Sequence, residues 1–289
     1  MKLAIIPARG GSKRISRKNL KSFAGRPLIA WSIIRALESK IFDQVIVSTD
    51  DNEIAVISKS YGAGVPFMRP KELSDDYVGV LDVIKHALGW YRENEISVEY
   101  VCCIFPTAPF INTHDLKIGF DKLISNQDRI VMSVCEYSSP IQRALNIDPS
   151  GVVSPVFPKK IKERTQDLES TYYDAGQFYW GEENTLFNGC KALISEQSIG
   201  IILPNVRVQD IDNIQDLNIA EAKFLNLEKQ KIIPKLTIGT ANFTQNYGII
   251  STRKGIAEEE LKKIFNYLDD VGINKIDTAI SYGETHKIL

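Results

Sequence analysis

A glycine-rich basic loop, residues 8–21, directly follows the apolar run of residues 3–6. Gly10 and Gly11 allow the backbone to approach a ligand closely and to present its N–H groups to an anion. The positive charge comes from five side chains, Arg9, Lys13, Arg14, Arg17 and Lys18. The spacing matches neither the dinucleotide-binding fingerprint nor the P-loop motif. The combination nevertheless suits a triphosphate, with a solvated basic loop as the plainer alternative.

Two carboxylates, Asp210 and Asp212, flank Ile211 late in the chain. Residues two apart in an extended segment point to the same side, so both carboxylates can reach one cation. Hard oxygen ligands of this kind suit Mg²⁺, and Mn²⁺ is a second candidate. The alternative is an Asx-type turn that precedes a helix near Asp216.

The composition and the net charge indicate no particular class of macromolecular partner. The chain has 289 residues, 44% of them hydrophobic and 25% charged, with a net charge of −1. We therefore expect a globular protein without a general affinity for nucleic acid or membranes. Cys102, Cys103, Cys135 and Cys190 lack zinc-site spacing and are expected to be reduced core residues. No signal peptide and no apolar run of about 20 residues is visible, so we expect a cytoplasmic protein.

The elements that must position these residues alternate between strand and helix patterns. Apolar runs predict strands at 3–6, 44–48 and 100–105, and amphipathic patterns predict helices at 28–39, 52–61, 80–93 and 115–125. This alternation predicts an α/β fold around a mostly parallel sheet. Because ligands bind at the carboxyl ends of strands in such sheets, the basic loop lies where a site is expected.

The pattern changes at two places along the chain. Residues 130–180 combine strand runs with a polar stretch and a hairpin signal at 148–151, which indicates an insertion or oligomerisation arm. Strands at 177–180 and 200–204 and a helix at 216–227 then complete the first domain, predicted at 1–230. Residues 231–289 read as a single β-α-β unit, too short for an independent core.

Several motifs, taken together, resemble the acylneuraminate cytidylyltransferase family. The agreement covers about residues 1–228 in order. It consists of residues 5–14 (IIPARGGSKR), 17–19 (RKN), 25–28 (GRPL), 47–50 (VSTD), 69–73 (RPKEL), 106–109 (PTAP) and 210–212 (DID). The resemblance implies a Rossmann-like three-layer fold of the nucleotide-diphospho-sugar transferase type, and transfer of CMP from CTP to the anomeric hydroxyl of a nonulosonic acid, with release of pyrophosphate.

The resemblance also implies roles for individual residues. Arg9, Lys13, Lys18, Asp210 and Asp212 match the catalytic positions, and the two aspartates match the metal ligands. The nucleotide would contact Ala8, Arg9, Gly10, Gly11, Ser12, Lys13, Asn19, Asp50, Arg69 and Thr107, and the sugar would contact Phe105, Arg164, Gln166, Tyr173 and Gln177. Members of the family pair through the region that corresponds to 130–180, so a homodimer is expected.

Two segments, residues 164–168 and 173–181, look most like the pseudaminic acid branch of the family. Phe105 and Ile111 replace the glutamine and arginine that are usual in the sialic acid branch, which favours a less polar sugar. That product would serve as a donor for bacterial surface glycans or flagellin. The alternatives are synthetases of CMP-N-acetylneuraminate, CMP-legionaminate or CMP-3-deoxy-manno-octulosonate. A non-catalytic nucleotide-binding module is the alternative of another class.

The tail carries a second resemblance. Residues 236–243 and 276–283 resemble the start of an aldo-keto reductase, with Asp277 and Tyr282 at the positions of its catalytic aspartate and tyrosine. A complete barrel of that kind needs about 250 residues, and the matching lysine and histidine would fall beyond Leu289. We therefore expect a truncated fragment without reductase activity.

Overall fold

The computed structural model describes residues 1–232, 236–240, 256–270, 273 and 275–279. The chain divides into two compact units, Met1–Phe224 and Leu225–Leu289. The predicted division at 230 lies within a helix, α5 (Ile214–Ile232), and the compact units meet inside the same helix. Each unit is described separately below.

A six-stranded mixed sheet forms the centre of the first unit, with the strand order β10-β6-β9-β5-β1-β4. The strands are β1 (Lys2–Pro7), β4 (Gln44–Ser48), β5 (Tyr100–Ile104), β6 (Val131–Glu136), β9 (Tyr172–Glu182) and β10 (Ile199–Leu203). β1 is parallel to β4 and β5, and β10 is parallel to β6. β9 is antiparallel to β5 and β6. The mostly parallel α/β sheet predicted from the sequence is confirmed.

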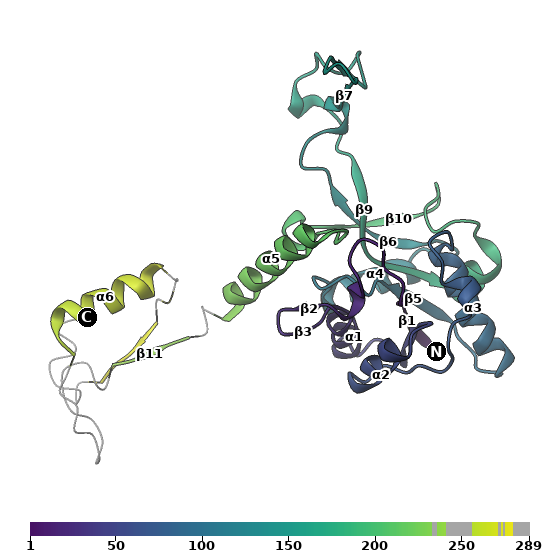
Figure 1. Cartoon of the computed structure of the whole chain (residues 1–289), viewed down its shortest axis with the longest axis horizontal. Coiled ribbons are helices and arrows are strands. Elements are labelled where there is room, and N and C mark those ends of the chain that lie inside the picture. Colours follow the sequence, from purple (N-terminus) through teal and green to yellow (C-terminus); the bar gives the residue numbers. More distant parts are fainter. Residues whose placement is uncertain (233–235, 241–255, 271–272, 274, 280–289) are drawn as a thin grey trace. The chain divides into compact units, whose positions relative to one another are not determined.

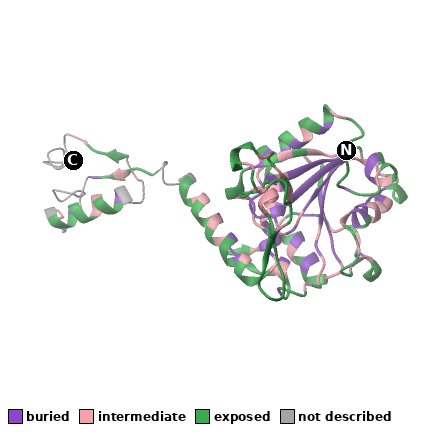
Figure 2. Ribbon diagram, turned by 90° about the horizontal axis from the view of Figure 1, so that it is seen from above, coloured by how far each residue is buried: buried purple, intermediate pink, exposed green. Residues whose placement is uncertain are grey.

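Side chains of the sheet alternate between two apolar layers. On β1, Ala4 and Ile6 belong to one layer, whereas Leu3 and Ile5 belong to the other. Helices α1 (Leu28–Glu38), α2 (Asn52–Ser60) and α4 (Thr113–Ile124) contribute to the first layer, and α3 (Val80–Glu93) contributes to the second. Figure 2 shows the resulting buried centre of the sheet. Continuous apolar strands are typical of a sheet that is covered on both faces.

Short connections complete the first unit. They are the small hairpin of β2 (Ser22–Phe23) and β3 (Arg26–Pro27), a π-helix at Thr185–Gly189, and 3₁₀ turns at Lys18–Leu20, Lys71–Leu73, Ile141–Arg143, Thr165–Asp167 and Asn205–Arg207. The sequence did not predict the hairpin or the π-helix. Phe224 of α5 packs against Phe23, Trp31 and Phe110, which attaches the start of α5 to this unit.

An arm, residues 137–171, projects from the sheet between β6 and β9 (Figure 1). It contains the antiparallel hairpin β7 (Leu145–Ile147) and β8 (Val153–Pro155), joined at the predicted turn, where Gly151 N donates to Asp148 O. The arm is narrower than the predicted range of 130–180. The two ends of the predicted range are β6 and β9, which are interior strands of the sheet. β6 pairs with β10, and β9 pairs with β5.

In the second unit, β11 (Ile238–Gly239) is parallel to β12 (Ile276–Asp277), and α6 (Glu258–Asp270) lies between them in the chain. Leu261 and Leu268 are buried on α6. This is the β-α-β order that the sequence predicts. Asp277 is exposed, and Tyr282 lies outside the described residues.

Two further expectations concern the described residues. All four cysteines are free, and Cys102, Cys103 and Cys135 are buried, as predicted for core residues. Burial raises the pKa of the Cys102 and Cys103 thiols. None of the described helices has the length and apolar character needed to span a membrane.

Candidate active site

The basic loop begins where β1 ends, at the carboxyl edge of the sheet. Ala8 N donates to Ser48 O at 2.9 Å, and Gly10 N donates to Asp50 Oδ1 at 2.9 Å, so the loop is attached to the end of β4. A Cβ atom at Gly10 would lie 2.7 Å from Asp51 Oδ2, whereas one at Gly11 would meet no atom within 4 Å. Gly10 is therefore needed for close packing, and Gly11 faces open space.

The five cations of the loop have different environments. Arg17 forms a bidentate pair with Asp51, at 3.0 Å for both bonds, and also pairs with Glu53 at 2.7 Å. Asp51 caps α2 by accepting from Ile54 N, and its hydrogen bonds with Arg17 hold the pKa of this carboxyl below its usual range. Arg17 thus anchors the loop to α2, a role that the sequence did not reveal.

Arg9, Lys13 and Lys18 line two adjoining hollows beside the loop. The first, about 280 Å³, is also lined by Ser12, Asn19, Arg69, Phe105 and Thr107. The second, about 360 Å³, is lined by Arg9, Ser12, Lys13, Arg14, Ile15, Lys18, Asp76 and Asp212. Both hollows share Arg9, Ser12, Lys18 and Asp76. The structure therefore brings most of the predicted nucleotide contacts together at one edge of the sheet.

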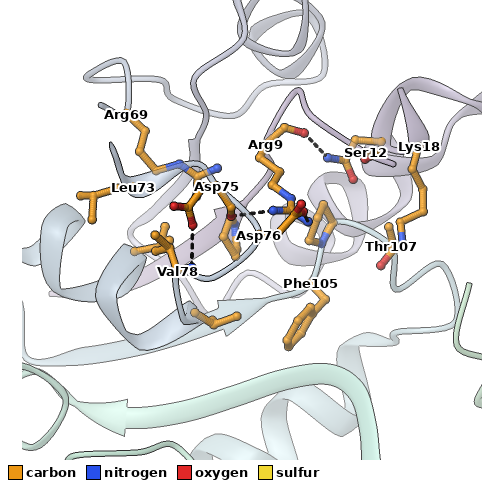
Figure 3. A pocket seen from close by; sticks show the side chains of 15 residues that line it. Arg9, Ser12, Lys18, Arg69, Leu73, Asp75, Asp76, Val78, Phe105 and Thr107 are labelled. Carbon is orange, nitrogen blue, oxygen red and sulfur yellow. Dashed lines mark hydrogen bonds and ion pairs between the residues drawn. The ribbon is translucent and has the colours of Figure 1, made fainter. Parts of the chain in front are cut away.

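A second loop, residues 74–79, enters this site and was not identified from the sequence. Asp76 pairs with Arg9, with 2.6 Å between Oδ1 and Nη2, and its other oxygen pairs with Lys13. Arg9 Nη1 also donates to Asp75 O at 2.6 Å. Figure 3 shows Arg9 beside Asp76 in the first hollow. Asp76 therefore forms ion pairs with two of the cations that the sequence predicts to bind a triphosphate.

Arg69 is almost fully buried on the other side of the first hollow, where its Nε donates to Ser74 at 3.1 Å. Its backbone N donates to Thr49 O at 2.8 Å, which fixes it to the end of β4. Burial lowers the pKa of Arg69. Asp50, predicted to contact nucleotide, lies 3.9 Å from Arg69 Nη2 and accepts from Gly10, so it positions both loops.

Asn19 and Lys18 lie in the 3₁₀ turn that ends the basic loop. Asn19 is buried and its Nδ2 donates to Arg9 O at 3.0 Å, which holds the backbone of the loop. Lys18 Nζ donates to Ile211 O at 2.6 Å and lies 3.9 Å from Asp212 Oδ1. Burial lowers the pKa of Lys18, while the charges of Asp212 and Asp210 oppose that shift. The basic loop and the acidic pair are therefore neighbours.

The acidic pair has the predicted local geometry. Ile211 is buried, whereas Asp210 is exposed and Asp212 is partly exposed and pairs with Arg14. The cap of α5 is formed by other residues: Asn213 Oδ1 accepts from Gln215 N and Asp216 N, and Asp216 Oδ2 accepts from Asp212 N. Neither Asp210 nor Asp212 caps the helix with its side chain. Among the described residues, no group of three or more His, Cys, Asp or Glu side chains could hold a metal.

The predicted sugar contacts lie in three places: the first hollow, the arm and β9. Phe105 lines the first hollow, and its ring lies 5.8 Å from that of Tyr179. Arg164 and Gln166 lie on the arm, where Arg164 pairs with Asp167 at 2.8 Å. Neither of these two lines the hollows of its own chain.

Tyr173 and Gln177 both belong to β9. Tyr173 packs against Tyr137, and burial raises its pKa to about 12. Gln177 is 2% exposed, and its Nε2 donates to Arg207 O at 2.6 Å. Gln177 is therefore buried, because β9 is an interior strand of the sheet.

This chain is similar in sequence to known proteins over most of its first unit. The cytidylyltransferase family profile matches residues 3–197. A pseudaminic acid cytidylyltransferase of Campylobacter jejuni is 43% identical over 225 residues, which is 76% of this chain and 94% of the relative. A CMP-N,N'-diacetyllegionaminic acid synthase of Legionella pneumophila is 30% identical, covering 80% of this chain and 99% of the relative.

A bifunctional protein of Helicobacter pylori, a pseudaminic acid cytidylyltransferase and UDP-2,4-diacetamido-2,4,6-trideoxy-beta-L-altropyranose hydrolase, is 30% identical over 94% of this chain and 50% of its own length. None of these three relatives is a reductase, so the resemblance of the tail to an aldo-keto reductase has no support from them.

Solved structures agree in fold. A CMP:2-keto-3-deoxy-manno-octonic acid synthetase complexed with CTP has a TM-score of 0.57 and 16% identity, covering 80% of this chain and 99% of that one. A 4-diphosphocytidyl-2C-methyl-D-erythritol synthase of Anaerococcus prevotii has a TM-score of 0.53. The family match, the identity to full-length relatives and the shared fold lead to one conclusion: this chain belongs to the cytidylyltransferase family and is a nucleotidyltransferase.

Proposed function

We propose that this enzyme transfers CMP from CTP to the anomeric hydroxyl of a nonulosonic acid, with pseudaminic acid as its preferred substrate. The observation that supports this most is the pair of adjoining hollows at the carboxyl edge of the sheet, which join Arg9, Lys13 and Lys18 to Arg69 and the acidic pair. The choice of sugar rests on the 43% identity to the Campylobacter jejuni enzyme.

In this proposal the phosphates of CTP bind beside the basic loop. Arg9, Lys13 and Lys18 face the β- and γ-phosphates, and the backbone at Gly11 and Ser12 donates to their oxygens, while Gly10 N stays bonded to Asp50. Arg69, Thr107 and the apolar wall of Val78, Val80 and Val83 enclose the nucleoside. The exposed position of Gly11 supports this arrangement, because a ligand can approach its backbone without displacing another residue.

A divalent cation fits beside the acidic pair. Mg²⁺ commonly binds to one or two carboxylates and completes its shell with phosphate oxygens and water. Asp210 and Asp212 supply such a pair, next to the Lys18 ammonium. When bound there, Mg²⁺ would neutralise charge on the phosphate oxygens. Mn²⁺ has the same ligand preference and is expected to substitute.

The reaction itself forms one bond and breaks one. The anomeric oxygen bonds to the α-phosphorus, the bond between the α-phosphorus and its bridging oxygen breaks, and the hydroxyl proton passes to solvent. The leaving group is pyrophosphate, whose negative charge increases as that bond breaks. Arg9 and Lys13 stabilise this charge, and such electrostatic stabilisation is the main contribution that a protein makes to phosphoryl and nucleotidyl transfer.

The arm supports a homodimer. It exposes an unusual amount of apolar surface, including Leu145, Ile147, Val152, Val153, Val156 and Phe157, with Ile147 71% exposed and Val152 63% exposed. A large exposed apolar patch is typical of an interaction surface. Arg164 and Gln166 lie on the same arm, so in a dimer they would be available to the sugar site of a second copy.

The test is a matrix of nucleotides and sugars. The purified chain with Mg²⁺ is mixed with CTP, ATP or UTP and with pseudaminic acid, N-acetylneuraminic acid, N,N'-diacetyllegionaminic acid or 3-deoxy-manno-octulosonic acid. Pyrophosphate and CMP-sugar are then measured. We expect the highest kcat/KM with CTP and pseudaminic acid, and no turnover in excess chelator. Faster turnover with another nucleotide, or no CMP-sugar with any acid, would contradict the proposal. If another of these sugar acids gives the highest kcat/KM with CTP, only the choice of pseudaminic acid is wrong, and the proposed reaction stands.

A further inference from the structure

The segment that carries the acidic pair, residues 207–212, is held by a partly buried ion pair at its first residue. Arg207 forms two hydrogen bonds with Asp115, one of them 3.2 Å long between Nη2 and Oδ1. Asp115 is 5% exposed and lies in the first turn of α4, where the helix dipole favours a carboxylate. The pair thus links the start of α4 to the segment 207–212.

Other contacts hold the same segment. Gln177 Nε2 donates to Arg207 O at 2.6 Å, and Val208 and Ile211 are buried. Toward the other end, Lys18 Nζ donates to Ile211 O at 2.6 Å. Each of these contacts involves the backbone or the inner face of the segment. The carboxylate of Asp210 stays exposed.

The ion pair also connects the two sides of the site. α4 directly follows the loop that carries Phe105 and Thr107, both of which line the first hollow. Arg207 lies three positions before Asp210. A buried ion pair adds little net stability compared with apolar residues of the same volume, but it fixes the groups that it joins. Here the ion pair joins α4, which follows the loop of Phe105 and Thr107, to the segment that carries Asp210 and Asp212.

We propose that Arg207 and Asp115 are positioning residues, which set the carboxylates of Asp210 and Asp212 at the correct distance from the bound nucleotide. This inference rests on the proposed function of the site. Neither Arg207 nor Asp115 lines either of the two hollows. Loss of the ion pair would displace the carboxylates and the contact of Ile211 O with Lys18. The start of the basic loop and Arg69 are attached to the end of β4 by separate hydrogen bonds and should keep their positions.

The expected consequence is selective. Residues that orient metal ligands typically contribute about 10- to 100-fold to metal affinity or activity. We therefore expect Arg207→Gln to lower kcat by about 10- to 100-fold and to weaken Mn²⁺ binding by about 10-fold. The Kd for CTP without metal should change less than kcat does, because Arg9 and Lys13 pair with Asp76 and not with the displaced segment, which contacts Lys18 through Ile211 O. Arg207→Lys keeps the positive charge but loses the bidentate geometry. Its kcat and Mn²⁺ affinity should lie between those of the parent chain and those of Arg207→Gln.

The experiment uses the full chain and three measurements: kcat, the Kd for CTP by calorimetry, and Mn²⁺ binding by electron paramagnetic resonance with CTP and no sugar. The variants are Arg207→Gln, Arg207→Lys, Asp115→Asn and the double variant Asp115→Asn/Arg207→Gln. The control is Arg92→Gln, which breaks another bidentate pair, Arg92 with Glu183, at 2.7 and 2.9 Å, away from the site.

The double variant should have a kcat and a Mn²⁺ affinity at least as high as those of the more impaired single variant. In a single variant, much of the loss comes from the charge that is left without its partner. Two results would overturn the inference. One is Mn²⁺ affinity and kcat in Arg207→Gln equal to those of Arg92→Gln. The other is a parallel loss of CTP binding and melting temperature, which would make the pair only structural. If the parent chain makes no CMP-sugar, the proposed function fails, while Mn²⁺ and CTP binding still test the pair.

Discussion

Replacing Asp76 with asparagine should make CTP bind more tightly. Asp76 pairs with both Arg9 and Lys13. These are two of the cations proposed to bind the phosphates, so CTP must displace this carboxylate before it can occupy the site. Asparagine keeps the volume of the side chain and removes its charge. The cost of displacement should therefore fall.

The exposure of the partners limits the size of the effect. The side chains of Arg9, Lys13 and Asp76 are 36%, 82% and 30% exposed, so water and salt screen both ion pairs. Exposed pairs of this kind are weak, each changing an equilibrium by about twofold to fivefold at most. Two such pairs, taken as independent, predict a Kd for CTP that is ~4- to ~25-fold lower in Asp76→Asn. The difference should shrink at ~0.5 M NaCl, where the Debye length is only a few ångströms.

Calorimetric titration with CTP in the absence of sugar measures this Kd directly, at low and high NaCl concentration. Glu72→Gln is the matched control. Glu72 is an exposed acid in the preceding 3₁₀ turn, and no ion pair with Arg9 or Lys13 is found for it in the part of the chain that the structure describes. Both variants lose one negative charge, so any general charge effect appears equally in both.

An unchanged or higher Kd for CTP in Asp76→Asn, relative to Glu72→Gln, would refute the reasoning. It would mean that Asp76 either stays in place when CTP binds or contacts the nucleotide favourably. A lower kcat together with a lower Kd for CTP in Asp76→Asn would still agree with the reasoning. Asp76 can also assist product release when it pairs again with Arg9 and Lys13.

The remaining predictions test other parts of the site and fold. Asp210→Asn and Asp212→Asn should each lower kcat by ~10²-fold or more without lowering the melting temperature, and near-normal turnover in both would argue against the metal pair. Gly10→Ala should lower both stability and CTP affinity, because its Cβ would lie 2.7 Å from Asp51, whereas Gly11→Ala should weaken CTP binding at unchanged melting temperature. Iodoacetamide at pH 8 should modify only Cys190 in the native protein, since Cys102, Cys103 and Cys135 are buried and burial raises the pKa of Cys102 and Cys103; mass spectrometry would show modification of the buried thiols if this is wrong. Ile147→Asp on the arm should shift the mass in solution toward the monomer, with Ile202→Asp, an exposed position on β10, as the control.

The sequence by itself determined the strands and helices that build the sheet. Apolar runs such as 3–6 and 100–105 became β1 and β5 because continuous burial on both faces leaves few alternatives. It also determined that the basic loop lies at a site, since the carboxyl ends of parallel strands lie at one edge. The burial of Ile211 between the exposed Asp210 and the partly exposed Asp212 agrees with the alternation that the sequence predicts.

The sequence could not separate residues that bind a ligand from residues that hold the loops. Arg17 and Asp50 have the residue types of ligand contacts, yet Arg17 pairs with Asp51 and Asp50 accepts from Gly10. Gln177 was predicted to contact the sugar but lies inside the protein. Burial and hydrogen-bond partners decide these roles, and both depend on segments that are distant in the chain.

Only the tertiary structure placed Asp76 beside Arg9 and Lys13, and Asp115 beside Arg207. The members of the second pair are 92 residues apart. No periodicity or motif links them, because hydrogen bonds and ion pairs act over a few ångströms in space and are independent of separation along the chain. The sequence determined which charges the protein carries; the packing of helices and loops around the sheet decided which of those charges meet.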